Sequence, residues 1–256
     1  MKTAAKLLQI LNHLVSFAEI CLLLLVALFA IYALMDNRQV YQAAGDIQES
    51  MLQYKPALSA DGESEDRKPN FTALWEINPD ICGWITMDGT AIDFPVVQGN
   101  SNLDYLNINA YGEYELSGSI FLDTRNAGDW SDPYCLLYGH QIVKHHMFGD
   151  LGLYRDHDFF QKNRTGILIL PDRVLNLQVL ACLQASAAET RIFDPVQANA
   201  QLEDLPAWIR THAEDCNEEL LLEFEKTPGW KTIALTTCSD DFTDSRTVVL
   251  ALAEEI

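Results

Sequence analysis

Thr232-Ile233-Ala234-Leu235-Thr236-Thr237-Cys238 is an apolar, β-branched run that ends in a cysteine, and it decides how the chain folds. Such a run is typical of a buried strand that carries a thiol at its end. Eight residues after the cysteine, Arg246-Thr247-Val248-Val249-Leu250 begins a second run, which predicts another strand with Arg246 at its start. If the two strands are neighbours, Cys238 and Arg246 face each other across one edge of a sheet.

A thiol beside a guanidinium is a reactive pair, because a nearby positive charge favours the thiolate, which is the nucleophilic form. Arg246 is also a candidate donor to a carbonyl oxygen that gains negative charge during acyl transfer. Proton transfer needs a third group. The best candidate is His140 in Leu136-Leu137-Tyr138-Gly139-His140, where another strand is predicted to end. Histidine suits this work, since its unperturbed pKa is ~6.5.

Each of these residues has a second interpretation that the pattern leaves open. Cys238 could be an ordinary core cysteine, and His140 a solvated loop histidine. Arg246 could be a surface arginine or an ion-pair partner of an acidic residue in the segment that follows Cys238, namely Asp240, Asp241 or Asp244. An ion pair would not exclude the catalytic role, because a carboxylate can orient the guanidinium.

Charge excludes one class of partner. The 256 residues include 17 Lys and Arg against 37 Asp and Glu, a formal net charge of −20. Without Lys2, Lys6 and Glu19, the remainder has 15 basic and 36 acidic residues, or −21. No nucleic-acid partner is expected, since phosphate binding needs concentrated positive charge. The length suits one domain with an additional segment.

Cysteine and histidine spacing predicts neither a metal nor a cofactor. No CxxC pair occurs, and no Cys/His spacing matches a zinc site. His145 and His146 are interpreted as surface residues. No structural disulfide framework is expected, because cysteines in apolar strand-like runs act as small hydrophobic residues. The six cysteines are Cys21 in the apolar N-terminal run, Cys82, Cys135 and Cys182 in strand-like runs, Cys216 and Cys238.

The N-terminal segment predicts a membrane span. Ile20 to Met35 is uncharged and almost wholly apolar, and extension back to Leu14 gives about 22 residues, enough for a bilayer core that needs ~20. A cleaved signal peptide has a shorter apolar core and a small-x-small cleavage site. Lys2 and Lys6 precede the run, which favours a cytoplasmic N-terminus. The alternative is a buried amphipathic helix.

After the span, helix-forming composition from Asp36 to Lys55 is followed by a polar, acidic linker, Pro56 to Asn70. From residue 71 the pattern changes to short apolar runs between turn residues, which indicates a mostly-β, barrel-like domain. Strands are predicted at 83–87, 92–97, 118–122, 134–138, 166–170, 174–183, 232–237 and 247–253. Helices are predicted at 70–77 (capped by Asn70), 147–161, 202–212 and 218–225.

These motifs together resemble the sortases, specifically class B. The resemblance spans roughly Phe71 to Ala253. Its site motifs are Tyr138-Gly139-His140, Met147-Phe148-Gly149-Asp150-Leu151, Leu235-Thr236-Thr237-Cys238 and Arg246-x-Val248-Val249. Further matches are Gly83-Trp84-Ile85, Ile92 to Gln98 and Gly118 to Asn126. One departure is Gln141, where many class B sequences have Asn.

The resemblance implies a mostly-β fold: an eight-stranded sortase-type barrel with an N-terminal helix and an inserted helix before the penultimate strand, preceded by a transmembrane helix. The implied organisation is a cytoplasmic N-terminus (1–13), a signal-anchor helix (14–35), an extracytoplasmic stalk and linker (36–70) and a catalytic domain (71–256). The implied location is a Gram-positive-type cell membrane, crossed once, with the catalytic domain outside.

The implied activity is that of a cysteine transpeptidase. Cys238 would attack the threonine carbonyl of a C-terminal sorting motif on a surface protein and form a thioester. An amine of a cell-wall precursor would then resolve the thioester. His140 would exchange protons, Arg246 would stabilise the oxyanion, and Thr236 and Thr237 would contact the substrate. No cofactor is implied.

Three alternatives stay open. A pilin-polymerising sortase would use a protein amine as acceptor, although no class C lid motif occurs between Asp36 and Asn70. A surface cysteine protease would pass the acyl group to water. A membrane-tethered binding module would have lost turnover, which the intact Cys, His and Arg disfavour.

Overall fold

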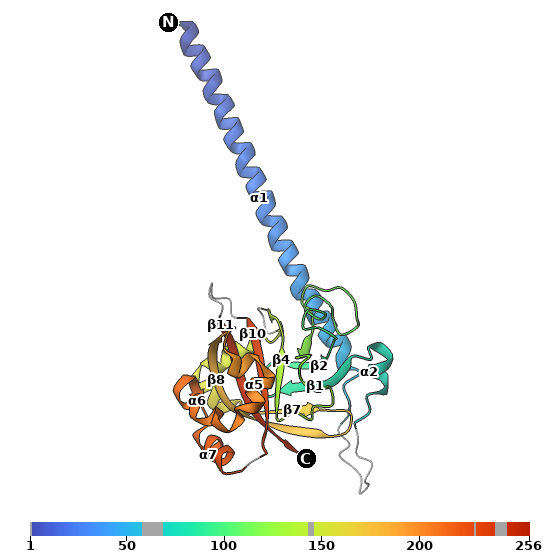
Figure 1. The fold of residues 1–256 in the computed structure, drawn as a ribbon. Helices are drawn as coiled ribbons and strands as arrows, with labels where there is room; N and C mark the ends of the chain where they lie inside the picture. Colours follow the sequence, from blue (N-terminus) through green and yellow to red (C-terminus); the bar gives the residue numbers. More distant parts are fainter. Residues whose placement is uncertain (1, 58–68, 143–145, 228, 239–244) are drawn as a thin grey trace. The chain divides into compact units, whose positions relative to one another are not determined.

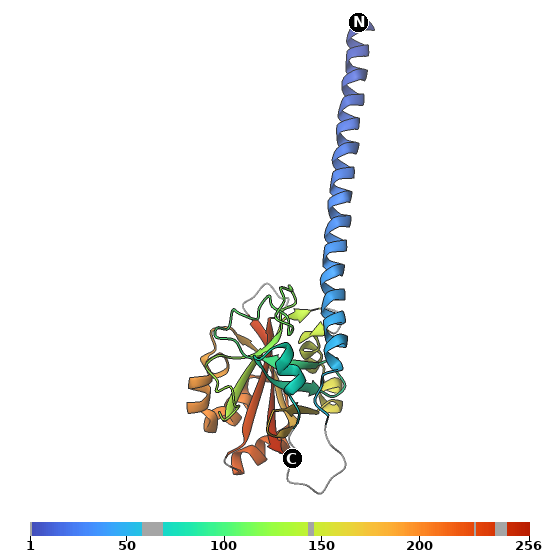
Figure 2. The ribbon, with the colours of Figure 1, turned by 90° about the vertical axis from the view of Figure 1, so that its right-hand side faces the viewer.

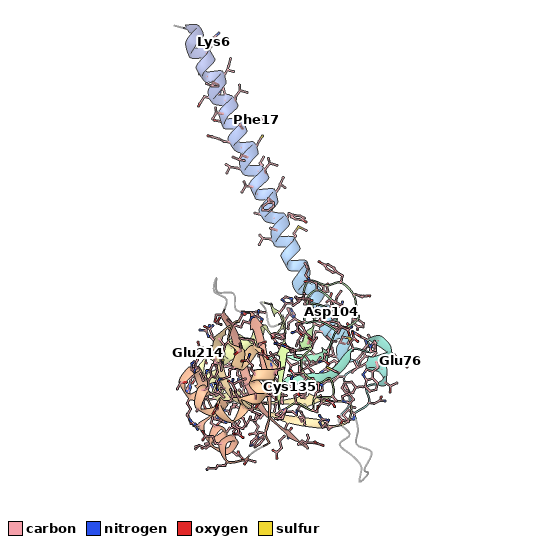
Figure 3. All side chains as sticks on the ribbon, viewed as in Figure 1. Lys6, Phe17, Glu76, Asp104, Cys135 and Glu214 are labelled. Atoms are coloured by element: carbon pink, nitrogen blue, oxygen red, sulfur yellow. The ribbon has the colours of Figure 1, made fainter. Side chains whose placement is uncertain are left out.

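The computed structural model describes residues 2–57, 69–142, 146–227, 229–238 and 245–256. The chain divides into two compact units, Met1–Gln42 and Ala43–Ile256. A single helix, α1 (Lys2–Leu52), runs through the first unit and into the second. Its segment Gln9–Met35 is 27 residues long with a mean hydropathy of 2.7, and none of it is buried. Apolar side chains such as Phe17 project from this helix into the surroundings (Figure 3), so the segment is long and apolar enough to span a membrane.

Eight strands of the second unit, counted over the described residues, close into a β-barrel (Figure 1). Their order around the barrel is β11-β10-β4-β3-β2-β1-β7-β8, and β8 pairs with β11 to complete the ring. The strands are β1 (Ile81–Met87), β2 (Asp93–Val97), β3 (Ile120–Leu122), β4 (Tyr134–Tyr138), β7 (Thr165–Ile169), β8 (Val174–Ser186), β10 (Lys231–Cys238) and β11 (Ser245–Glu255). The predicted eight-stranded barrel is confirmed, with every predicted strand present.

Two hairpins have the turns that the sequence indicates. Gly89, between β1 and β2, has a φ of 74°, a left-handed conformation that glycine adopts without a Cβ clash. Strands β7 and β8 pair in antiparallel fashion around Pro171 and Asp172. A short strand, β9 (Ala213–Cys216), pairs with the outer side of β8 and is not part of the ring.

The strongly apolar strands are buried on both faces, which explains their nearly continuous hydrophobic runs. Tyr134, Leu136, Ala234 and Leu250 belong to a cluster that packs against the helices on one side of the barrel. Those helices are α4 (Thr190–Phe193), α5 (Pro195–Ala200), the 3-10 helix η2 (Leu202–Asp204), α6 (Leu205–His212) and α7 (Glu218–Lys226). The inserted helix predicted at 202–212 is therefore present as η2 and α6, before the penultimate strand.

Helix α2 (Thr72–Ile77) begins two residues later than predicted. Asn70 is not its N-cap; instead the Asn70 side chain accepts a hydrogen bond from the backbone N–H of Thr72, at 2.9 Å. Phe71 occupies the cap position without a side-chain hydrogen bond. The polar residue thus stabilises the turn before the helix and leaves the cap position to a buried aromatic residue.

The prediction of a single helix at 147–161 is wrong. Two short strands, β5 (Gln141–Ile142) and β6 (His146–Met147), are followed by a 3-10 helix, η1 (Gly149–Arg155), and then by α3 (His157–Lys162). Asp156 has extended backbone angles, and its side chain accepts from the N–H of Phe159 at 2.9 Å. Gly149 and Gly152 lower helix propensity, and Asp156 caps a new helix.

The second compact unit includes part of the segment assigned to the stalk. Met51 is 1% exposed and belongs to a core cluster with Phe71, Leu74 and Trp84. The Tyr111 hydroxyl donates to Ser50 Oγ at 2.9 Å, and Lys55 Nζ lies 2.8 Å from Asp93 Oδ1. The last turns of α1 are therefore packed into the barrel unit.

Candidate active site

Strands β10 and β11 bring two of the predicted residues together. They pair in antiparallel fashion from Lys231↔Ala253 to Cys238↔Arg246, so the cysteine and the arginine are directly opposed at one end of the pair. Directly opposed residues in an antiparallel pair carry their side chains on the same face. The two strands are therefore neighbours, which is the condition under which the sequence places Cys238 opposite Arg246. The Cys238 side chain and residues 239–244 lie outside the described part of the chain, and with them the predicted partners Asp240, Asp241 and Asp244.

Strand β4 brings the histidine to the same end. It runs parallel to β10, with Thr236 beside Tyr138, and the N–H of Gly139 donates to the Thr236 carbonyl at 3.1 Å. His140 follows two residues after Tyr138, as Cys238 follows two residues after Thr236. Because parallel strands end at the same edge of a sheet, His140, Cys238 and Arg246 come from three segments that meet at one edge of the barrel.

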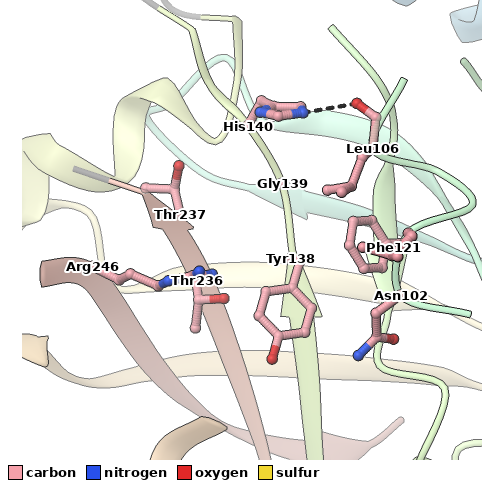
Figure 4. A pocket seen from close by; sticks show the side chains of 10 residues that line it. Asn102, Leu106, Phe121, Tyr138, Gly139, His140, Thr236, Thr237 and Arg246 are labelled. Carbon is pink, nitrogen blue, oxygen red and sulfur yellow. Dashed lines mark hydrogen bonds between the residues drawn. The ribbon is translucent and has the colours of Figure 1, made fainter. Parts of the chain in front are cut away.

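A pocket of about 260 Å³ opens at this edge (Figure 4). Described residues from five segments line it: Asn102, Leu103 and Leu106 from a loop, Phe121 from β3, Tyr138, Gly139 and His140 from β4 and its end, Thr236 and Thr237 from β10, and Arg246 from β11. Four predicted site residues, His140, Thr236, Thr237 and Arg246, therefore share one pocket.

The His140 imidazole is held by the opposite wall of the pocket. Its Nε2 lies 2.8 Å from the Leu106 carbonyl oxygen (Figure 4). A carbonyl can only accept, so Nε2 carries a proton in this contact.

Arg246 lies between the pocket and the neighbouring helices. Its guanidinium carbon is 5.5 Å from the centre of the Phe193 ring, a distance at which a cation is attracted to the face of an aromatic ring. The side chain extends toward Thr236 (Figure 4). Contact with the Phe193 ring restricts the movement of the guanidinium, and because the ring carries no charge, the guanidinium keeps its full positive charge.

Thr236 and Thr237 are neighbours near the end of β10. Both are buried, yet both line it. The Thr236 hydroxyl donates to the Leu137 carbonyl at 3.0 Å, so it joins β10 to β4. This bond gives the buried Thr236 hydroxyl a partner inside the protein.

The floor of the pocket includes residues that sequence reasoning missed. The rings of Phe121 and Tyr138 lie 5.3 Å apart, and burial raises the pKa of the Tyr138 hydroxyl far above its ordinary value. Both residues stand in stretches that carry the resemblance, and their aromatic character could have identified them. No sequence signal indicates Leu106.

Asn102 is fixed in the wall by a network that begins at a buried carboxylate. Its side chain donates to Asp123 Oδ2 at 2.9 Å and accepts from the Thr124 N–H at 2.8 Å. Arg125 binds the same carboxylate through Nε at 2.9 Å and Nη2 at 2.7 Å. Burial opposes ionisation of Asp123, but the hydrogen bonds from Arg125 and Asn102 outweigh it and lower the pKa of the carboxyl.

The other cysteines are free thiols, and four of them are poor nucleophiles. Burial raises the pKa of Cys82, Cys135 and Cys182 to about 12 and also raises the pKa of Cys216. Since the thiolate is the reactive form, these residues stay protonated at neutral pH. Cys135 and Cys182 are fully buried, as expected for cysteines that act as small hydrophobic residues.

His146 is less exposed than its interpretation as a surface residue implies. His146 is only partly exposed, and its ring lies against Gly45 of α1. His145 falls outside the described residues.

Comparison with known proteins agrees with this geometry, although no family model matches the chain. The chain is 38% identical to Sortase B of Staphylococcus aureus over 113 residues, which are 44% of this chain and 46% of that protein. The chain thus matches about half the length of this curated relative.

Two solved structures match more of the chain. The structure of a Streptococcus pyogenes class B sortase involved in pilus biogenesis is 35% identical, with a TM-score of 0.65, and the match covers 72% of this chain and 98% of that one. A Bacillus anthracis protein similar to sortase B is 27% identical, with a TM-score of 0.66, and the match covers 87% and 97% of the two chains. The sequence identity and coverage of these relatives, together with the eight-stranded barrel, establish that the chain belongs to the class B sortase family.

Proposed function

We propose that the chain is a membrane-anchored cysteine transpeptidase. It would cleave a C-terminal sorting motif after threonine and transfer the surface protein to an amine of a cell-wall precursor. The observation that carries the proposal is the register of β10, in which Cys238 is opposite Arg246 and Thr236 lies beside Tyr138, two residues before His140. Nucleophile, proton carrier and oxyanion donor are the three groups that acyl transfer through an enzyme thiol requires.

In the first step, the Cys238 thiolate attacks the threonine carbonyl carbon and a C–S bond forms. The carbonyl oxygen becomes an oxyanion, which accepts hydrogen bonds from the Arg246 guanidinium. Arg246 suits this role, because a guanidinium carries several N–H donors and the ring of Phe193, which contacts it, accepts no conventional hydrogen bond. The threonine C–N bond then breaks, His140 gives a proton to the departing amine, and a thioester remains.

In the second step, an amine attacks the thioester, His140 accepts the proton of that amine, and the Cys238 thiolate leaves. Leu106 supports this proton exchange, because its carbonyl fixes the ring through Nε2 and leaves Nδ1 available. The threonine side of the substrate would lie along Thr236, Thr237 and the aromatic floor of the pocket. The family resemblance implies a motif of the Asn-Pro-x-Thr type.

The same proposal includes a location. Gln9–Met35 would cross the membrane once, with the N-terminus in the cytoplasm and the barrel outside, as the two lysines before the span favour. Substrates would then be secreted proteins with a sorting signal, which arrive at the outer face of the membrane.

A second candidate function is polymerisation of pilins. The Streptococcus pyogenes relative, of which the match covers 98%, is described as involved in pilus biogenesis. The chemistry at Cys238 would be the same, and the acceptor would be a lysine amine of a second protein subunit in place of a wall-precursor amine.

The test uses the full chain in detergent, as wild type and Cys238→Ala. Fluorogenic sorting-motif peptides are offered with an oligoglycine amine, a lysine-containing pilin-like peptide or no amine, and products are identified by mass. Cleavage after threonine that requires Cys238 and joins the product to the amine supports the proposal, and the preferred amine selects between the two candidates. Release of free acid only, despite added amines, would indicate a protease. Cleavage by neither protein would favour a binding module.

A further inference from the structure

The backbone of His140 is held by residues that follow it closely in the chain. After His140 the chain turns back through β5 and β6, whose connecting residues 143–145 lie outside the description. The N–H of Phe148 donates to the His140 carbonyl at 3.1 Å. Phe148 is fully buried, and a Cβ added at Gly139 would lie 2.7 Å from its ring. The position of His140 therefore depends on the position of Phe148.

Met147, the residue before Phe148, has a strained backbone. Its φ is 51°, in the left-handed region that residues with a Cβ rarely adopt. Met147 is only 4% exposed. Strain of this kind persists where surrounding packing determines the conformation, and it is concentrated near functional sites. The left-handed backbone of Met147 therefore requires stabilising contacts from the residues that surround it.

The last turns of α1 provide that packing. Met147 and four α1 residues, Ala44, Ile47, Gln48 and Met51, line one small cavity of about 20 Å³. Next to Met147, the His146 ring lies so close to Gly45 that an added Cβ would be 3.0 Å from the ring carbon Cε1. Figure 2 shows the short strands β5 and β6 beside this end of α1. Only glycine fits at position 45 without displacing the ring.

A second connection runs through the β1–β2 turn. Gln48 Nε2 donates to the Ala91 carbonyl at 2.7 Å, and the N–H of Ala91 donates to Asp150 Oδ2 at 2.8 Å. Asp150 is buried in η1, two residues after Phe148. The segment around Phe148 is therefore held by α1 at Met147 and, through Ala91, at Asp150.

We propose that the α1 end, Ala44–Met51, is a positioning element for His140. It acts through His146, Met147 and Asp150, which fix Phe148 and with it the His140 backbone, and it contacts no substrate. The inference rests on the proposed role of His140. A helix that served only for stability would affect unfolding and leave the state of the His140 ring unchanged.

The test is a double-mutant cycle in the full chain in detergent: Gly45→Leu, His146→Ala and both together, with Asp46→Leu as the matched control. Asp46 is the exposed neighbour of Gly45 on the same helix. Leucine at position 45 displaces the His146 ring, and removal of that ring in the double variant makes room for it. Readouts are kcat, KM, Tm and the NMR signal of the His140 ring, assigned with His140→Gln.

The expected result is a fall in kcat of about tenfold or more for Gly45→Leu, because misplacement of a catalytic group by 1 Å can cost ~100-fold. KM and Tm stay near wild type, the His140 signal moves, and the double variant recovers most of the loss. Asp46→Leu behaves as wild type. An unchanged His140 signal in Gly45→Leu, or a kcat loss that His146→Ala does not relieve, would overturn the inference.

The NMR signal separates this inference from the proposed function. A wild-type chain without turnover would refute the transpeptidase, whereas the shift of the His140 signal in Gly45→Leu, and its return in the double variant, would still decide whether α1 positions the ring.

Discussion

At the residue level, the role proposed for Arg246 depends on the shape of its guanidinium as well as on its charge. A lysine at this position keeps the charge but loses the planar fork of donors and the flat contact with the Phe193 ring. We expect Arg246→Lys to lower kcat/KM about 100-fold, as removal of an oxyanion donor does. Tm should change little. The measurement is steady-state kinetics with a sorting-motif peptide.

The control is Arg210→Lys, because Arg210 pairs with Glu218 and Glu225 on the helical side of the barrel and does not line the pocket. This variant should retain full activity. Wild-type kinetics for Arg246→Lys would mean that charge alone suffices and would contradict the role of the guanidinium as an oriented donor.

Cys238 should react with alkylating reagents faster than the other cysteines. Burial raises the pKa of Cys82, Cys135 and Cys182 to about 12, so these thiols should stay unlabelled in the native protein. We expect iodoacetamide at about pH 8 to modify Cys238 first, because a guanidinium opposite it favours the thiolate. Peptide mapping by mass spectrometry gives the order of modification.

Cys216→Ala serves as the control, since Cys216 is only partly buried and lies in β9, outside the barrel ring. Removal of Cys216 should leave the rate at Cys238 unchanged. Faster modification of Cys216 than of Cys238 in the wild-type chain would argue that Cys238 is not an activated thiol.

At the scale of elements, the loop that carries Asn102 depends on the buried carboxylate of Asp123. We expect Asp123→Asn to lower the free energy of unfolding by about 1–2 kcal/mol, because the hydrogen-bonded buried carboxylate is lost and Arg125 no longer has an ionic partner there. Arg125 is 41% exposed, so solvent screening limits the loss. Tm should fall by about 2–8 °C. Asp158→Asn, at an exposed position of α3, is the control.

The stabilisation of the fold by ionised Asp123 should decrease as the pH falls. The folded-state pKa of Asp123 lies below the ordinary 3.8, so its contribution is complete above that value and is lost as pH falls through the lowered pKa. The stability difference between wild type and Asp123→Asn should therefore be constant from pH 7 to about 5 and narrow below about 4. Denaturant melts across this range measure it. A difference that grows on acidification would be inconsistent with an ionised, stabilised Asp123.

For the whole molecule, the barrel unit begins at Ala43 and not at residue 71. A fragment 71–256 lacks Met51, which is 1% exposed, and the contacts of Gln48, Ser50 and Lys55 with the barrel. We expect this fragment to be less stable than fragment 43–256 by about 3 kcal/mol or more, since burial of one large apolar side chain alone contributes ~2–3 kcal/mol. Thermal melts of the two fragments check it.

Fragment 43–256 should melt at the temperature of the full chain, because residues 2–42 form a separate compact unit. Equal melting temperatures for fragments 43–256 and 71–256 would show that the α1 end contributes nothing to the stability of the barrel.

The strands, their order along the chain and the membrane-length apolar segment could all be predicted from the sequence. Runs such as Thr232 to Cys238 have the period, β-branching and length of buried strands, and these local properties survive folding. The sequence also indicated that Cys238 and Arg246 would face each other if their two strands were neighbours, and the structure pairs these strands. Local pattern failed at 147–161, where helical spacing competes with Gly149, Gly152 and the cap at Asp156.

The surroundings of these residues could not be predicted from the sequence, because they depend on how distant segments pack together. The closure of β8 on β11, the contact of His140 with Leu106 and the approach of Gly45 to His146 join segments far apart in the chain. Such contacts leave no periodic pattern in the sequence, because they result from the packing of elements against one another and not from the conformational preference of any one element. The sequence therefore indicated the candidate site residues, and the tertiary structure supplied the groups that contact them.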